Sequence, residues 1–194
     1  MKKGILAIGA IALVLITAGL SLADEVESEP TGGEPGWTMI YYLAGDNEQE
    51  TYADNTVGQL QAGTMGVANH PQILVLIDRL STSTTEIFEV ENGEIIPLET
   101  LPEQNTASSA VLEDFTSYAL NRAEYEKVAM VIKSEGLAWR GIGRDNTHPE
   151  ELPDQLMTNS DLAEALVNAQ SSSGKELDLL VLEGSIMSFM EVVY

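Results

Sequence analysis

Four short apolar runs constrain the fold of this chain more than any other feature of its sequence. They are Trp37–Ala44, Gln72–Asp78, Val128–Ile132 and Leu177–Leu182. Largely apolar runs of this length are typical of strands that are buried on both faces. Helix-compatible patterns lie between them, over Glu48–Gln61, Ala110–Asn121 and Leu162–Ala169. The alternation predicts an α/β domain with a mostly parallel central sheet covered by helices on both faces.

One segment departs from this alternation. Within Thr84–Leu98, the run Glu86–Val90 is followed by Asn92-Gly93 and then by Ile95-Ile96. An Asn-Gly pair between two strand-like runs is a strong signal for a β-hairpin. We expect this hairpin to form an appended excursion outside the central sheet.

Two short stretches begin where inferred strands end. Lys133–Gly141 follows the run Val128–Ile132, and Glu183–Tyr194 follows Leu177–Leu182. Ligand sites in open parallel sheets lie beyond the carboxyl ends of the strands. The pattern therefore places Glu135 and Ser185, which belong to these stretches, at the functional edge of the sheet.

The same two stretches resemble the active-site motifs of the clostripain-like peptidases, the C11 family of the caspase-type clan. The first reads Lys-Ser-Glu-Gly-Leu-Ala-Trp-Arg-Gly, where the family has roughly S/D-H-G-x-x-W-x-G. The second reads Glu-Gly-Ser-Ile-Met-Ser-Phe-Met-Glu-Val-Val-Tyr, where the family has D-A-C-L-M-x-x-x-E-V-x-Y. The resemblance covers most of residues 37–194 and implies a caspase-like three-layer α/β fold. Because further strands follow the second motif in the family, it also implies a domain that is truncated at its carboxyl end.

The residues that carry the family's chemistry are replaced in this chain. Glu135 stands at the position of the catalytic His, and Ser185 stands at that of the nucleophilic Cys. The chain has no cysteine, which excludes a thiolate nucleophile. A serine hydroxyl needs a general base, and an ordinary carboxylate with a pKa of about 4.3 is a poor one. We therefore predict an exported, catalytically inactive clostripain-like homologue, which is either a pseudopeptidase or a gene fragment.

Two alternatives remain open at this point. One is an active endopeptidase that cleaves after Arg or Lys and uses Ser185 with Glu135 or with His148 as the base. The other is a non-catalytic subunit of a split peptidase, which would bind a complementary carboxyl-terminal polypeptide.

Two further residues acquire expected roles through the resemblance. Glu183 matches the family's Asp two residues before the Cys, which is thought to receive an Arg or Lys side chain, so basic peptides are expected partners. Gly136 matches the glycine whose backbone N–H contributes to the oxyanion hole. The alternatives are a solvated strand-end acid for Glu183 and an ordinary turn glycine for Gly136.

The amino-terminal residues predict export. Met1–Lys3 are followed by the apolar run Gly4–Leu20 and by Ser21-Leu22-Ala23, which is typical of a signal peptide with its cleavage site. An uncleaved membrane anchor over residues 1–23 is the alternative, and it would be the only contact with a membrane. Residues 24–36 are rich in Glu, Pro and Gly and predict an acidic disordered linker before the domain of residues 37–194.

The charge of the chain limits its partners. The formal net charge is −22, and removing the leader with Lys2 and Lys3 leaves 7 basic against 31 acidic residues, or −24. Such a surface repels nucleic acid. We expect no cofactor and no metal site, because the acidic loop Asp46-Asn47-Glu48 lacks the ligand spacing of a Ca²⁺-binding loop.

Overall fold

A six-stranded sheet forms the centre of the protein in a computed structural model, which describes residues 36–148, 156–185 and 187. The predicted leader and nearly all of the predicted linker, residues 1–35, lie outside the described residues. The strands are β1 (Trp37–Gly45), β2 (Gln72–Arg79), β3 (Thr84–Glu91), β4 (Glu94–Pro102), β5 (Lys127–Ser134) and β6 (Leu179–Gly184). The helices are α1 (Glu50–Thr64), α2 (Ser109–Arg122), α3 (Asn159–Ser173) and the short 3₁₀ helix η1 (Ala138–Arg140).

The sheet has the strand order β4-β3-β2-β1-β5-β6. Strands β2, β1, β5 and β6 run parallel to their neighbours, as the alternation of strands and helices predicted. The chain goes from β1 to β2 on one side and later returns to place β5 on the other side of β1. In such sheets the reversal of strand order opens a crevice beyond the strand ends.

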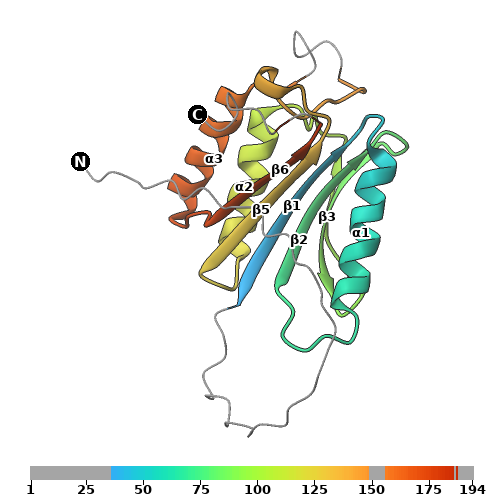
Figure 1. Cartoon of the computed structure of the whole chain (residues 1–194), viewed down its shortest axis with the longest axis vertical. Helices are drawn as coiled ribbons and strands as arrows, with labels where there is room; N and C mark the ends of the chain where they lie inside the picture. The colour runs from blue at the N-terminus through green and yellow to red at the C-terminus, as the bar shows by residue number, and fades with distance from the viewer. Residues whose placement is uncertain (1–35, 149–155, 186, 188–194) are drawn as a thin grey trace, which may run out of the picture. The chain divides into compact units, whose positions relative to one another are not determined.

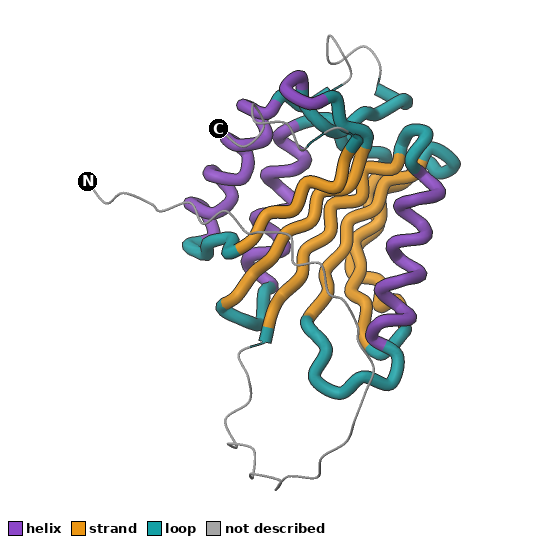
Figure 2. The backbone as a smooth tube through the Cα atoms, in the orientation of Figure 1, coloured by secondary structure: helices purple, strands orange, loops and turns teal. Residues whose placement is uncertain are grey.

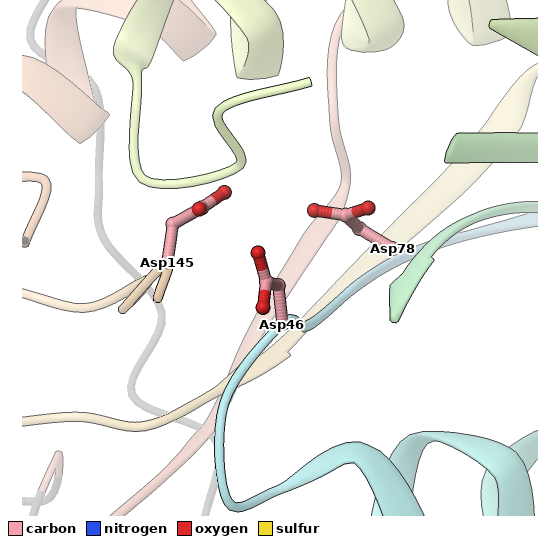
Figure 3. Close-up of side chains that lie close together, drawn as sticks. All are labelled: Asp46, Asp78 and Asp145. Carbon is pink, nitrogen blue, oxygen red and sulfur yellow. The ribbon is translucent and has the colours of Figure 1, made fainter. Parts of the chain in front are cut away.

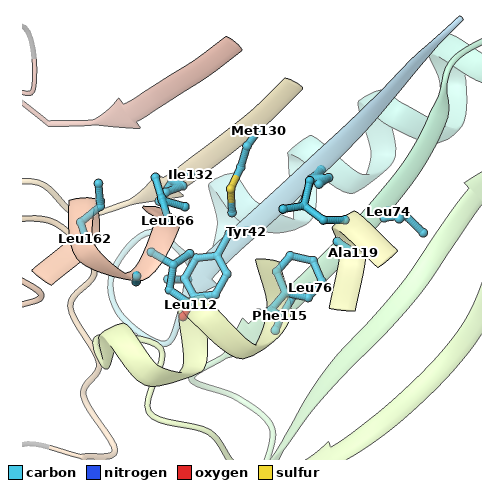
Figure 4. Close-up of a cluster of buried hydrophobic side chains, with 14 of the residues drawn as sticks. Tyr42, Leu74, Leu76, Leu112, Phe115, Ala119, Met130, Ile132, Leu162 and Leu166 are labelled. Carbon is cyan, nitrogen blue, oxygen red and sulfur yellow. The ribbon is translucent and has the colours of Figure 1, made fainter. Parts of the chain in front are cut away.

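Helices cover the two faces of the sheet (Figures 1 and 2). On one face, helices α2 and α3 pack with Ile40, Tyr42 and Met130 into a core that Figure 4 shows in part. On the opposite face, α1 packs through Ala53 and Val57. Two covered faces explain why β1 and β2 are apolar at nearly every position: alternate side chains enter different cores.

The predicted hairpin exists, but its expected position was wrong. Asn92 and Gly93 both have positive φ, of 49° and 84°, as a two-residue turn with this sequence requires. However, β3 pairs antiparallel with β2 and so extends the central sheet. Ile87 and Phe88 show the physical reason, because they are buried in the two opposite cores and β3 is therefore covered on both faces.

The fourth apolar run was predicted to form a buried core strand, and this prediction was wrong. Strand β6 lies at the edge of the sheet, and Leu179 is 49% exposed. Leu180 and Val181 are each 38% exposed. Helix α1 packs over β1 and β3 and not over this end of the sheet, which leaves one face of β6 open among the described residues.

Helix α3 has well-defined ends that its sequence explains. The Thr158 hydroxyl accepts a hydrogen bond from the Asp161 N–H at the first turn. Gly174, with φ of 69°, ends the helix in the left-handed conformation that glycine adopts without strain. Within the described part of the chain, no helix is long and apolar enough to span a membrane.

Replacing Leu112 by Ala tests the importance of the core beneath α2 and α3. Leu112 is completely buried, so Leu112→Ala is expected to lower the free energy of unfolding by about 2–5 kcal/mol. Urea unfolding followed by circular dichroism measures the loss. The control is Val167→Ala on the exposed side of α3, where we expect a change within about 0.5 kcal/mol. Equal effects of the two substitutions would contradict this assignment of the core.

Candidate functional site

The carboxyl ends of the parallel strands bring the two motif stretches together. Ser134 of β5 is paired with Gly184 of β6, so Glu135 and Ser185 each directly follow one member of this pair. Gly136 fits closely against the second motif. A Cβ atom there would lie 2.7 Å from the Ser185 carbonyl oxygen and 2.6 Å from Met187 Cγ. Only glycine therefore allows the two stretches to approach this closely.

Glu135 forms an ion pair at the position where the resemblance places the catalytic His. Its carboxylate lies 3.3 Å from the Arg144 guanidinium, and Arg144 also lies 3.8 Å from Glu48. The Glu135 side chain is 25% exposed, whereas Ser185 is exposed. The Glu135 carboxylate thus already has a cationic partner within the chain.

Glu183 also has a basic partner within the chain. Its carboxylate lies 2.6 Å from Lys133 Nζ, across the pairing of β5 with β6. Lys133 is mostly buried and Glu183 is about half exposed. The carboxylate expected to receive a basic side chain thus already contacts one, and a ligand would have to compete with Lys133.

The turn after Glu135 depends on unusual backbone conformations. Ala138 has φ of 53° at the start of η1, and Gly141 has φ of 140°. A Cβ at position 141 would lie 2.0 Å from the Met157 carbonyl oxygen. Ile142 then pairs with Met157 through two backbone hydrogen bonds of 2.9 Å. This pairing directs the following residues, Gly143–His148, back across the strand ends toward β1.

His148, the alternative base, lies at the end of this loop. Its Nδ1 is 3.2 Å from Asp145 Oδ1, and its backbone N–H donates to the same oxygen at 3.1 Å. The structure thus associates His148 with Asp145. The other histidine, His70, lies beside Pro71 before β2 begins.

Three buried aspartates form a cluster that the sequence analysis missed. Asp46 follows β1, Asp78 is near the end of β2, and Asp145 lies in the loop after β5. One carboxylate oxygen from each lies within 4.8 Å of the others, and Figure 3 shows the three side chains converging. All three residues are at most 1% exposed.

Burial and the closeness of the carboxylates raise the pKa of several residues in and around this cluster. Burial, together with the charges of Glu103, Asp145 and Asp46, raises the pKa of Asp78 to about 7, although a hydrogen bond from Thr85 opposes the shift. Burial also raises the pKa of Asp46, as does the nearby Asp145 carboxylate. The pKa of Glu103 rises for the same reasons, burial first and the charge of Asp46 next. Several carboxylates thus share a region that disfavours their combined negative charge.

The sequence indicates two members of this cluster, but the spacing of residues along the chain does not indicate the third. Asp46 and Asp78 both stand where apolar strand runs end, so a parallel arrangement brings them to one edge. Asp145 joins them through the loop that follows Ile142. Its place depends on the pairing of Ile142 with Met157, which no local pattern predicts.

Comparisons with known proteins agree with this geometry. The mostly parallel sheet with reversed strand order, the helices on both faces and the paired motifs define a caspase-like α/β protein. The model of the clostripain family, peptidase C11, matches residues 41–194. The chain therefore belongs to this family. A search of curated proteins gave no match.

Solved structures share the fold at low sequence identity. One is a secreted C11 cysteine protease from Bacteroides thetaiotaomicron in complex with an irreversible peptide inhibitor, with 23% identity and a TM-score of 0.69 over 83% of this chain. Another is an inactive zymogen C11 protease from Parabacteroides distasonis, with 24% identity and a TM-score of 0.63, also over 83% of this chain. The chain spans 46% and 45% of these two structures.

The raised pKa of Asp78 predicts how stability depends on pH in chelator-treated protein. Its folded pKa of about 7 exceeds the unfolded value of 3.8, so the folded state holds the proton more tightly between these values. The free energy of unfolding is therefore expected to fall as pH rises from about 4 to about 7. Asp78→Asn should make this dependence shallower and raise stability at pH 8. Urea unfolding at several pH values in EDTA measures both effects, and identical slopes for the two proteins would contradict the shift.

Proposed function

We propose that this chain is an exported, catalytically inactive member of the clostripain family that binds Arg- or Lys-containing peptides. The observation that carries the proposal is the state of the motif residues at the strand ends. Glu135 faces a guanidinium 3.3 Å away, and Ser185 replaces the cysteine on which the family's chemistry depends. The two motif stretches nevertheless remain in contact through Gly136. The scaffold of the site is retained while its reactive groups are not.

Two observations support export. The amino-terminal residues have the pattern of a signal peptide, and similar structures are described as secreted C11 proteases. A chain without cysteine also needs no oxidative folding outside the cytoplasm. Whether the leader is removed or retained as an anchor is decided by the mass of the chain recovered from its own host.

Binding of basic peptides is supported by the contact between Glu183 and Lys133. In this ion pair the Glu183 carboxylate contacts a basic side chain of the chain itself at the end of β6, which supports the proposal. A guanidinium makes two parallel hydrogen bonds to a carboxylate, whereas an ammonium group acts as a point charge. An Arg ligand is therefore expected to bind the exposed Glu183 carboxylate more strongly than Lys133 does and to displace it.

A second candidate function is that of a subunit that binds a complementary polypeptide. The edge position of β6 favours it, because among the described residues no strand pairs with this edge and the side chains of Leu179 and Val181 beside it are exposed. Co-purification of the chain with a polypeptide from its own host tests this candidate.

The proposed inactivity has a direct enzymatic test. Full-length protein incubated with Arg- and Lys-containing peptides is expected to give no turnover above buffer, at neutral pH and with or without Ca²⁺. Mass spectrometry of the peptides detects cleavage. Turnover that disappears in Ser185→Ala would establish the endopeptidase alternative, and further loss in His148→Ala would identify its base.

Competition for Glu183 predicts opposite effects of two substitutions. Lys133→Gln frees the carboxylate and is expected to strengthen binding of a short Arg peptide several-fold, whereas Glu183→Gln should weaken it several-fold. Fluorescence polarisation at about 20 mM and about 150 mM salt measures the affinities and their screening.

The control for this experiment is Glu176→Gln. It removes the same charge from an exposed residue that precedes β6, at the opposite end of the strand. If Glu176→Gln weakens binding as much as Glu183→Gln does, net charge alone accounts for the attraction.

A further inference from the structure

The turn between β3 and β4 is bound to the end of helix α1 by three hydrogen bonds. Helix α1 lies over β3 (Figure 1), and its last turn ends beside Asn92 and Gly93. The Gly93 N–H donates to Thr64 Oγ1 at 2.9 Å, and the Gly93 carbonyl accepts from Gln61 Nε2 at 3.0 Å. The Gly66 N–H donates to Asn92 Oδ1 at 2.9 Å. Both turn residues are thus held by helix α1 and by the segment that follows it.

An Asn that precedes a Gly is prone to lose ammonia from its side chain, because glycine has no Cβ to shield its nitrogen. A bond forms between the Gly93 nitrogen and Asn92 Cγ, and the bond between Cγ and Nδ2 breaks. The proton of the Gly93 N–H passes through water to the leaving nitrogen, which departs as ammonia. Water then opens the five-membered imide at either carbonyl carbon and leaves aspartate or iso-aspartate at position 92.

The conformation of the folded turn opposes this reaction. Asn92 has φ of 49°, in the left-handed region, where ψ is about +47°. In this conformation the Gly93 nitrogen and the Asn92 Cβ lie on opposite sides of the bond between Cα and the carbonyl carbon. Asn92 Cγ therefore cannot reach the nitrogen that must attack it. Ring closure requires the turn to leave its native conformation.

The hydrogen bond to Thr64 also opposes the reaction. Thr64 is 2% exposed, and its hydroxyl donates to the Leu60 carbonyl at 3.0 Å, which leaves a lone pair for the Gly93 N–H. Deprotonation of Gly93 breaks this bond, so the folded turn stabilises the unreactive amide. The bond from the Gly66 N–H holds the Asn92 carboxamide as well.

The hairpin that carries the turn is exposed on the side of β4. Strand β4 lies at the edge of the sheet, and most of its residues are exposed, including Ile95 and Ile96. Elements with few buried contacts open locally at a lower free energy than the whole domain. Separation of the turn from α1 releases the Gly93 N–H and lets Asn92 rotate while the core remains folded.

We propose that Asn92 is a site of spontaneous deamidation that Thr64 protects in the folded protein and that becomes reactive when the turn separates from α1. The product adds a carboxylate, and iso-aspartate also inserts a methylene group into the backbone of a two-residue turn. The modified turn cannot bind α1 as before, so the modification records that a molecule has opened. Because β3 runs antiparallel to β2, the turn lies at the opposite end of the sheet from the motif stretches. The proposal is therefore independent of the proposed peptide binding.

Deamidation rates of the full-length protein and of a peptide with the sequence of residues 88–97 test the protection. Both are incubated at mildly alkaline pH and physiological temperature, and tandem mass spectrometry locates aspartate and iso-aspartate at position 92. The folded protein is expected to react at least tenfold more slowly than the peptide. Equal rates would overturn the proposal.

Two substitutions in the same helix test the role of the Thr64 hydroxyl. Thr64→Val keeps the shape of the side chain but removes the acceptor for the Gly93 N–H, and it should speed deamidation several-fold. The matched control is Thr56→Val, because the Thr56 hydroxyl also donates to the carbonyl four residues earlier, at 2.9 Å from the Tyr52 oxygen. We expect no change in the rate for this control. Equal rates for the two variants would show that Thr64 does not protect the turn.

A measurement on the wild type alone keeps the test decisive if Thr64→Val fails to fold. Urea at concentrations below the unfolding transition is expected to accelerate deamidation at Asn92 before the circular dichroism of the protein changes. A rate that stays constant until the whole domain unfolds would rule out local opening of the turn and overturn the proposal.

Discussion

The position of β1 between β2 and β5 is the constraint on which the rest of the structure depends. Its side chains are buried on both faces, with Tyr42 in one core and Leu43 in the other. Because the chain leaves β1 first toward β2 and later toward β5, segments far apart in the sequence meet beyond its carboxyl end. This arrangement brings the two motif stretches together and also brings the three aspartates together.

Two groups of acidic side chains at this edge are stabilised in different ways. Glu135 and Glu183, which are partly exposed, each have a cation from the chain itself, Arg144 and Lys133. The buried aspartates rely on hydroxyl and backbone donors, which leave one of their oxygens, Asp46 Oδ1, without a partner. The partly exposed carboxylates can thus exchange partners at little cost, whereas burial raises the pKa of Asp46 and of Asp78.

The sequence predicts much of the fold because two-sided burial leaves a clear apolar pattern in β1, β2 and β5. The sequence places β3 wrongly, outside the central sheet. Glu86 and Glu89 give this strand the polar character of an exposed hairpin, although Ile87 and Phe88 are buried. The sequence also overestimates the burial of β6, since Leu179–Leu182 has the composition of a core strand and only the strand order places it at the edge. The motif glutamate and serine are recognisable in the sequence, but the cluster is not. Asp145 reaches Asp46 only through the tertiary pairing of Ile142 with Met157.

The open edge of β6 has a consequence for the behaviour of the protein in solution. A strand with free backbone groups and apolar side chains is a template for pairing with an identical edge. The net charge of −22 opposes such encounters between copies, but only over the distance at which salt leaves the repulsion unscreened. Colloidal stability of this chain is therefore expected to decline with ionic strength. The acidity of the surface thus opposes association through an edge that no strand covers among the described residues.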